Sequence, residues 1–252
     1  MTAYYNEIDP YAAQWLRNLI DAGHIAHGHV DERSIVEVTA NDLAGYRQCH
    51  FFAGIGGWSY ALRLAGWTDD RPVWTGSCPC QPFSVAGKRT GDGDERHLWP
   101  EFLRLIAECK PASVFGEQVA SAAGRAWLAA VRTDLETVGY AVGGGDLCAA
   151  GIGAPQIRQR LFWVADADYT GREGTERQGE PDQARPEWAT ACGEPVRSDR
   201  GPWPPGPGEV HAIPVLANGL PGVVGGCKGY GNAIVPQVAA EVISAYMATV
   251  DV

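Results

Sequence analysis

The chain has 252 residues, 45% of them hydrophobic, and a formal net charge of −10. A chain of this length can bury a full core, so we expect one α/β domain with a small appendage rather than two independent domains. The negative charge argues against a protein that coats nucleic acid through bulk electrostatics, because neutralisation of phosphates is the main source of non-specific affinity.

Targeting signals and cysteine usage point to a reducing compartment. The chain lacks an apolar run long enough to span a bilayer, and the opening MTAYYNEIDP is acidic, so we expect a cytoplasmic protein without membrane contact. Its seven cysteines form an odd set that fits free thiols better than a disulfide framework. Cys78 and Cys80 are separated by a single residue and no second close pair exists, so no metal site is expected.

Strands and helices are predicted to alternate from the first residues onward. Residues 3–8 are typical of a strand, and PYAAQWLRNL of a helix with Pro10 in its first turn. A strand at 48–53 runs into GIGG and a helix over 58–64. Further strands are predicted at 73–77, at 112–115 and in the apolar run IRQRLFWVA. Helices are predicted between them, at 99–109 and 126–138. This alternation predicts a largely parallel sheet.

The composition changes abruptly after residue 165. Residues 166–210 are rich in Gly, Pro, Glu and Arg, with five arginines against ten acids, which is typical of a separate small module or a mobile insertion. Order resumes near Val210, and residues 235–247 predict a closing amphipathic helix.

Several short motifs stand at predicted strand ends. FFAGIGG is a strand followed by a glycine turn and a helix, an arrangement that lets a ligand approach the backbone closely. It is followed in order by PCQPFS with Cys80, GEQV with Glu117, QIRQR ending at Arg160, and Gly231-Asn232 in GYGNAIVPQ.

Together these blocks resemble those of the DNA (cytosine-5) methyltransferase family, which read F-x-G-x-G-G, P-C-Q, E-N-V, Q-x-R-x-R and G-N. The resemblance covers nearly the whole chain outside the Gly/Pro-rich insertion. It implies a Rossmann-like class I S-adenosylmethionine-dependent methyltransferase of bacterial or phage type, with a mostly parallel seven-stranded sheet and a small irregular target-recognition insertion.

The resemblance also assigns chemical roles. Cys80 is expected to add as a thiolate to carbon 6 of a flipped-out cytosine in duplex DNA, which makes carbon 5 nucleophilic. Glu117 is expected to be an acid with a raised pKa that shares a proton with ring nitrogen 3. Arg160 should lie near the cytosine oxygen, and Arg158 should brace a loop or a phosphate. Gln118 departs from the family Asn. The expected DNA contacts are Gln81, Ser84, Lys88 and Arg89.

The family's two acidic cofactor strands are missing between GIGG and PCQ. Similar blocks occur instead at the N-terminus, in YNEIDPYAAQWL and HVDERSI, so we predict a circular permutation in which residues 1–47 supply these strands. By this resemblance Glu7 binds the ribose and Asp31 the adenine of S-adenosylmethionine. The full expected cofactor set is Glu7, Ile8, Asp31, Phe52, Gly54, Ile55, Gly56, Gly57, Pro79, Asn232 and Ala233.

The predicted organisation is a catalytic domain at 1–165, with its permuted strands in 1–47 and its cofactor loop and catalytic blocks in 48–165. A recognition insertion follows at 166–210, and 211–252 return to the catalytic domain. The expected cofactor is S-adenosylmethionine, with S-adenosylhomocysteine as product. Double-stranded DNA is the expected partner, a cognate restriction endonuclease a further one, and the protein is expected to be a monomer. Two alternatives stay open: an RNA cytosine-5 methyltransferase, and an inactive DNA-binding relative.

Overall fold

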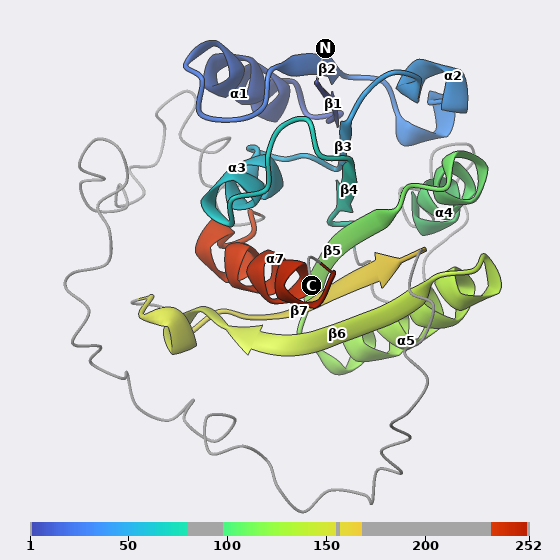
Figure 1. Cartoon of the computed structure of the whole chain (residues 1–252), viewed down its shortest axis with the longest axis vertical. Coiled ribbons are helices and arrows are strands. Elements are labelled where there is room, and N and C mark those ends of the chain that lie inside the picture. The colour runs from blue at the N-terminus through green and yellow to red at the C-terminus, as the bar shows by residue number, and fades with distance from the viewer. Residues whose placement is uncertain (1, 80–97, 155–156, 168–232, 251–252) are drawn as a thin grey trace, which may run out of the picture.

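The computed structural model describes residues 2–79, 98–154, 157–167 and 233–250. Within these ranges the strands form one seven-stranded sheet in the order β2-β1-β3-β4-β5-β7-β6, stacked from top to bottom in Figure 1. The strands are β1 (Ala3–Asn6), β2 (Gly28–Asp31), β3 (Gln48–Phe51), β4 (Val73–Gly76), β5 (Ser113–Val119), β6 (Ala141–Cys148) and β7 (Gln159–Asp166).

Only β7 runs against the other strands of this sheet. The pairs β2–β1, β1–β3, β3–β4 and β4–β5 are all parallel. β7 is antiparallel to both of its neighbours, β5 and β6. The predicted fold class, an α/β protein with a mostly parallel seven-stranded sheet, is confirmed.

The order of the strands in space differs from their order in the chain. β1 and β2 precede β3 in the sequence, yet they lie outside it, with β2 at the sheet edge. The carboxyl ends of five parallel strands, including these two, therefore meet along one edge of the sheet.

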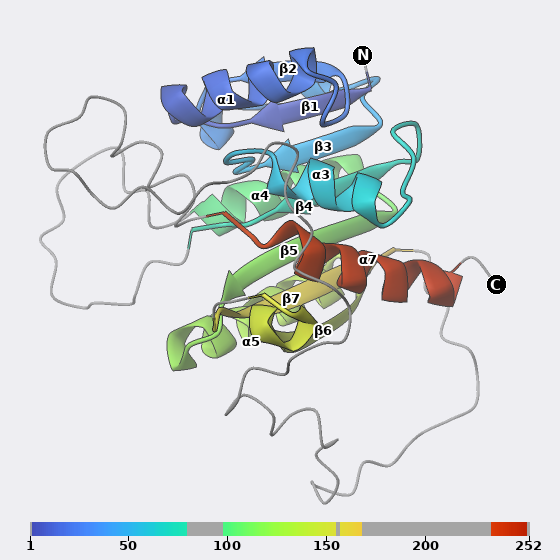
Figure 2. The same cartoon turned by 90° about the vertical axis from the view of Figure 1, so that its left-hand side faces the viewer.

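Helices cover both faces of the sheet. They are α1 (Pro10–Asp21), α2 (Ala40–Leu43), α3 (Gly57–Leu64), α4 (Leu98–Cys109), α5 (Ala122–Thr137) and α7 (Pro236–Val250), with short 3-10 turns at Ile35–Glu37 and Ala149–Ile152. Helices α1, α3 and α7 lie on one face, toward the viewer in Figure 2, and α2, α4 and α5 on the other. Each face has its own apolar core: Trp58, Phe115 and Phe162 lie on the first and Phe102, Leu135 and Trp163 on the second.

Local signals explain where the first helices begin. Pro10 opens α1, and the Asp9 side chain accepts hydrogen bonds from the backbone N–H groups of Tyr11 and Ala12. Gly56 precedes α3 with a φ of 83°, a left-handed conformation that glycine adopts without strain.

One predicted helix begins earlier than expected, and one strand forms in a segment for which the sequence predicts no element. Helix α5 begins at Ala122 rather than 126, because the Ser121 hydroxyl accepts from the Gly124 N–H and caps an earlier turn. Residues 141–148 are glycine-rich and lack an alternating pattern, yet they form β6, because apolar β7 offers them a full antiparallel partner. The predicted insertion at 166–210 lies almost wholly outside the described residues, so its boundaries stay a prediction.

Candidate active site

The register of four parallel strands places the residues that follow them side by side. Asn6, Phe51, Gly76 and Gly116 are aligned across β1, β3, β4 and β5. The next position on each strand is therefore Glu7, Phe52, Ser77 and Glu117, at the carboxyl edge of the sheet. In open α/β sheets this edge is where ligands bind.

Glu117 and Arg160 form a buried ion pair at one end of this row. Arg160 Nε lies 2.6 Å from Glu117 Oε1, and the two side chains are 17% and 7% exposed. Burial raises the pKa of Glu117, while the guanidinium of Arg160 and a hydrogen bond from Ser77 oppose that rise. The carboxyl group is thus poised to change protonation nearer neutral pH than an ordinary glutamate.

Two hydrogen bonds fix the base of the segment that leads to Cys80. The indole Nε1 of Trp58 donates to Ser77 Oγ at 3.0 Å, and Gln118 Nε2 donates to the Cys78 carbonyl at 3.1 Å. Gln118 Oε1 in turn accepts from the Val119 N–H at 2.8 Å. Gln118, which stands where the family has Asn, is therefore bonded at both ends of its amide.

The predicted nucleophile and all four predicted DNA contacts lie outside the described residues. Pro79 is the last described residue of this segment and is exposed. Cys80, Gln81, Ser84, Lys88, Arg89 and Asn232 fall in the ranges whose structure is not described.

Arg158 bonds to the returning C-terminal segment. Its Nη2 donates to the backbone carbonyl of Ala233 at 2.6 Å. The first arginine of the QIRQR motif and the second thus have different bonding partners, Ala233 and Glu117 respectively.

Glu7 ties the end of β1 to the glycine turn after β3. Its Oε2 accepts from the Gly54 N–H at 2.7 Å, and its Oε1 accepts from the Asp9 N–H at 2.9 Å. The turn itself needs left-handed backbone, with φ of 53° at Phe52 and 55° at Gly54. Next to Glu7, Ile8 is 63% exposed at the sheet edge.

The C-terminal segment packs closely on the same turn. A Cβ atom placed on Gly57 would lie only 2.8 Å from Ile234 Cγ1, so the absence of a side chain at Gly57 permits this approach. Residues from three distant parts of the chain, Glu7, Gly54 and Ile234, therefore lie around one glycine turn.

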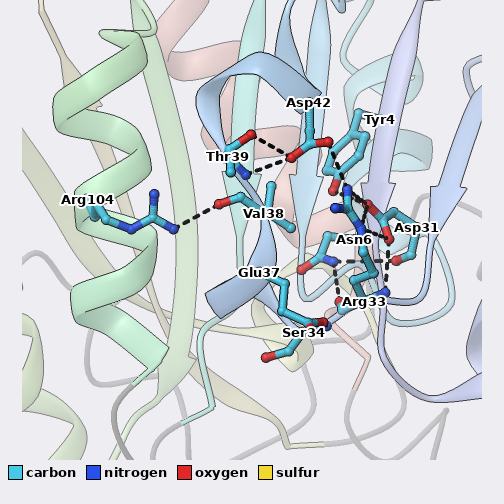
Figure 3. Close-up of polar contacts among 10 residues, drawn as sticks. All are labelled: Tyr4, Asn6, Asp31, Arg33, Ser34, Glu37, Val38, Thr39, Asp42 and Arg104. Atoms are coloured by element: carbon cyan, nitrogen blue, oxygen red, sulfur yellow. Dashed lines mark hydrogen bonds and ion pairs between the residues drawn. The ribbon is translucent and has the colours of Figure 1, made fainter.

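Asp31, at the end of β2, is held by a polar cluster drawn in Figure 3. Its Oδ2 accepts from the Tyr4 hydroxyl at 2.8 Å and from Arg33 Nη2 at 2.7 Å, while Arg33 also reaches Asp42 at 3.1 Å. Burial alone would raise the pKa of Asp31, but the hydrogen bonds from Arg33 and Tyr4 hold it below its usual value. Sequence reasoning misses Arg33, although an arginine two residues after a strand-end aspartate could have indicated the pair.

The chemistry of these side chains suits a ligand with vicinal hydroxyls and an apolar ring. Carboxylate oxygens have about four lone-pair sites, so Glu7 can accept from hydroxyls beyond its two backbone bonds. Exposed Ile8 offers an apolar contact beside it. These residues therefore fit the adenosine part of S-adenosylmethionine.

No helix in the described ranges is long and apolar enough to cross a membrane.

Comparison with known proteins finds similarity to Type II methyltransferases. The Type II methyltransferase M.AplI of Arthrospira platensis is 38% identical, with 37% of this chain and 28% of that protein covered. Type II methyltransferase M.HhaI of Haemophilus parahaemolyticus is 26% identical, with 52% of each chain covered. The chain thus spans about half or less of the length of these relatives. A solved structure of a DNMT2 mutant from Spodoptera frugiperda has a TM-score of 0.48 and 16% identity, covering 70% of this chain and 45% of that one.

Residues 68–187, which hold the Glu117 and Arg160 pair, match the model for C-5 cytosine-specific DNA methylases. Over this region the chain is similar to C-5 cytosine-specific DNA methylases.

Proposed function

We propose that this chain transfers a methyl group from S-adenosylmethionine to carbon 5 of a flipped-out cytosine in duplex DNA, with Cys80 as nucleophile. The observation that carries the proposal is the buried Glu117–Arg160 pair, which lies at the sheet edge beside the segment leading to Cys80. A buried acid with a raised pKa suits proton sharing with a cytosine ring nitrogen, and the guanidinium of Arg160 fixes its position.

In the proposed reaction the Cys80 thiolate forms a bond to carbon 6 of the cytosine. Ring electron density then moves toward nitrogen 3, where Glu117 shares its proton, and carbon 5 becomes the nucleophile. Burial raises the pKa of Glu117, which favours the protonated form that this step uses. Arg160 fixes the carboxyl group through its 2.6 Å contact.

Bound S-adenosylmethionine would supply an activated methyl group. Glu7 is proposed to accept the ribose hydroxyls, with Ile8, Phe52 and the glycine turn 54–57 around the nucleoside and methionine parts. Pro79, Asn232 and Ala233 complete the proposed set. The adenine amine is assigned to Asp31, whose carboxylate already accepts from Tyr4 and Arg33 and would accept a further bond.

We also infer that the chain is circularly permuted relative to its family. Support comes from the sheet order, in which β1 and β2 come first in the chain but lie outside β3 at the edge. Glu7 supports the same idea, because it follows β1 and bonds across to Gly54 after β3.

The DNA contacts stay proposals at the level of the sequence. Gln81, Ser84, Lys88 and Arg89 are assigned to the loop that closes over the flipped base, and residues 166–210 to target recognition. A restriction endonuclease partner is proposed with them, since M.AplI and M.HhaI are named Type II methyltransferases. A monomeric state is proposed as well.

Covalent capture tests the activity directly. Duplex DNA containing 5-fluorocytosine at varied sequences is incubated with S-adenosylmethionine and the protein, and a denaturation-resistant adduct is sought. We expect an adduct with the wild type and with the matched control Cys78→Ser, and none with Cys80→Ser. An adduct on tRNA but not on duplex DNA would favour the RNA enzyme. Donor binding without any adduct would favour an inactive binder.

A further inference from the structure

Ser77 lies between Trp58 and Glu117, at a place where none of the motifs discussed above assigns a function. It directly follows β4, and the register that aligns Gly76 with Gly116 makes Ser77 and Glu117 neighbours on adjacent strands. The Trp58 indole donates to its Oγ at 3.0 Å, and Ser77 lies beside Glu117 and lowers the pKa of its carboxyl group. Ser77 thus stands between a fixed donor, Trp58, and the Glu117 carboxylate.

The direction of these bonds follows from the chemistry of the groups. An indole N–H can only donate, so Trp58 occupies a lone pair of the Ser77 oxygen. The hydroxyl hydrogen of Ser77 is then left to point at the Glu117 carboxylate, which accepts. Trp58 is buried and packs against Phe115 and Phe162 with ring centroids 6.2 and 6.1 Å away, so the donor is held by the core.

We propose that Ser77 is a positioning residue that tunes and orients Glu117, and that Trp58 holds the Ser77 hydroxyl in the required orientation. This inference rests on the proposed function, because it names a partner for the acid of that reaction. We call Trp58 and Ser77 together the relay. It offers Glu117 an uncharged donor on the β4 side, opposite the charged donor Arg160 on the β7 side.

The groups that face Glu117 set the direction of the effect. They are Arg160 and Arg158 from the β7 side and Ser77 from β4. A hydroxyl that donates to a carboxylate stabilises its charged form, so loss of the Ser77 hydroxyl makes Glu117 harder to ionise. Both arginines remain in that case, so the change isolates the relay.

The test measures the rate of single-turnover methylation as a function of pH for wild type, Ser77→Ala and Trp58→Phe. The substrate is the DNA duplex identified by 5-fluorocytosine capture. In Ser77→Ala the part of the pH–rate profile that reports ionisation of Glu117 should move to higher pH by about one unit. The reason is that a hydrogen bond to a charged group, which this variant loses, is strong enough for such a change. Trp58→Phe should move it less, in the same direction, and Ser77→Thr should restore the wild-type position.

Trp67→Phe is the matched control. Trp67 is buried, packs against Phe115 and donates its indole N–H to the Arg71 carbonyl, so it loses an equivalent bond away from Glu117. Its profile should coincide with wild type. A Ser77→Ala profile that also coincides with wild type would overturn the proposal, and Trp58→Phe gives an independent variant if Ser77→Ala does not fold.

A second readout separates failure of the relay from failure of the activity. Infrared titration of the Glu117 carboxyl, identified by its loss in Glu117→Gln, needs no turnover. If the wild type forms no adduct, the proposed function fails, while a shifted titration in Ser77→Ala still supports the relay. If the adduct forms and neither the titration nor the profile shifts, only the relay is refuted.

Discussion

Glu117 and Gln118 are neighbours on β5 whose side chains alternate across the strand, and each is fixed to a different neighbouring segment. Glu117 pairs with Arg160 of β7, whereas Gln118 donates to the carbonyl of Cys78 after β4. The first contact opposes the rise that burial causes in the pKa of the proposed acid. The second holds the backbone two residues before the proposed nucleophile.

Replacing Gln118 by Leu should therefore affect both stability and reaction. The buried Cys78 carbonyl would lose its donor and the Val119 N–H its acceptor, which costs about 1 to 3 kcal/mol in the free energy of unfolding. We expect urea denaturation to record this loss, and adduct formation with 5-fluorocytosine DNA to slow while S-adenosylhomocysteine binding persists.

The shorter amide in Gln118→Asn gives the matching variant. It keeps the donor but shortens its reach by one methylene, so its adduct rate should fall between wild type and Leu. Equal adduct rates for wild type and Gln118→Leu would contradict a bracing role.

Single residues differ in how far the sequence predicts them. Glu117 and Arg160 could be named because each stands in a short motif at a strand end. Ser77 and Trp58 could not be paired, because their hydrogen bond depends on how α3 packs over β4. The same holds for Asp31: its place at a strand end is predictable, but its bonds to Tyr4 and Arg33 depend on the β1–β2 register.

Among the elements, α7 follows a segment that packs closely on a single glycine. Ile234, two residues before α7, lies where a side chain at Gly57 would be. The same C-terminal segment accepts a hydrogen bond from Arg158 at Ala233. These two contacts join the start of the C-terminal segment to the glycine turn and to the start of β7, beside the apolar packing of α7 itself.

Gly57→Ala tests this docking. The new Cβ would lie 2.8 Å from Ile234 Cγ1, so α7 or the turn must shift, and we expect a loss of about 1 to 3 kcal/mol in urea denaturation. Gly151→Ala is the control, since a Cβ there meets nothing within 4 Å and its stability should stay close to wild type. Equal stabilities of the two variants would show that α7 docks by other contacts.

At the level of elements, prediction fails where tertiary partners decide. The glycine residues 143–145 do not favour a strand, and β6 exists because β7 pairs with it along its whole length. The strands β1, β3, β4 and β5 were predictable because compact apolar runs end in turn residues. Helix α5 begins four residues before its predicted start because the Ser121 hydroxyl caps an earlier turn.

For the whole molecule, a buried histidine at the centre of the sheet sets a limit on acid stability. His50 on β3 contacts Thr75 Oγ1 at 2.8 Å and Gln48 Oε1 at 3.3 Å and stacks on Tyr5. Burial lowers its pKa from 6.5 to about 3. The folded protein therefore keeps this ring neutral, while the unfolded chain binds a proton below about pH 6.5.

The stability that His50 provides is fully present above pH 6.5 and is lost progressively as the pH falls toward 3. Compared with His50→Gln, the wild type should lose up to about 1.4 kcal/mol more per pH unit below pH 6. Urea denaturation at several pH values measures this slope. His24→Gln, at an exposed position, should run parallel to wild type, and a parallel curve for His50→Gln would contradict the prediction.

The contact between Gly57 and Ile234 has a consequence for synthesis of the chain on the ribosome. The turn after β3 is bonded to Glu7 from the beginning of the chain and is packed by Ile234 from near its end. A nascent polypeptide can pair β1, β2 and β3 early, because these strands are close in sequence. It cannot finish the surroundings of the turn until α7 has emerged, so the proposed donor site stays incomplete while the segments between β3 and α7 are being made.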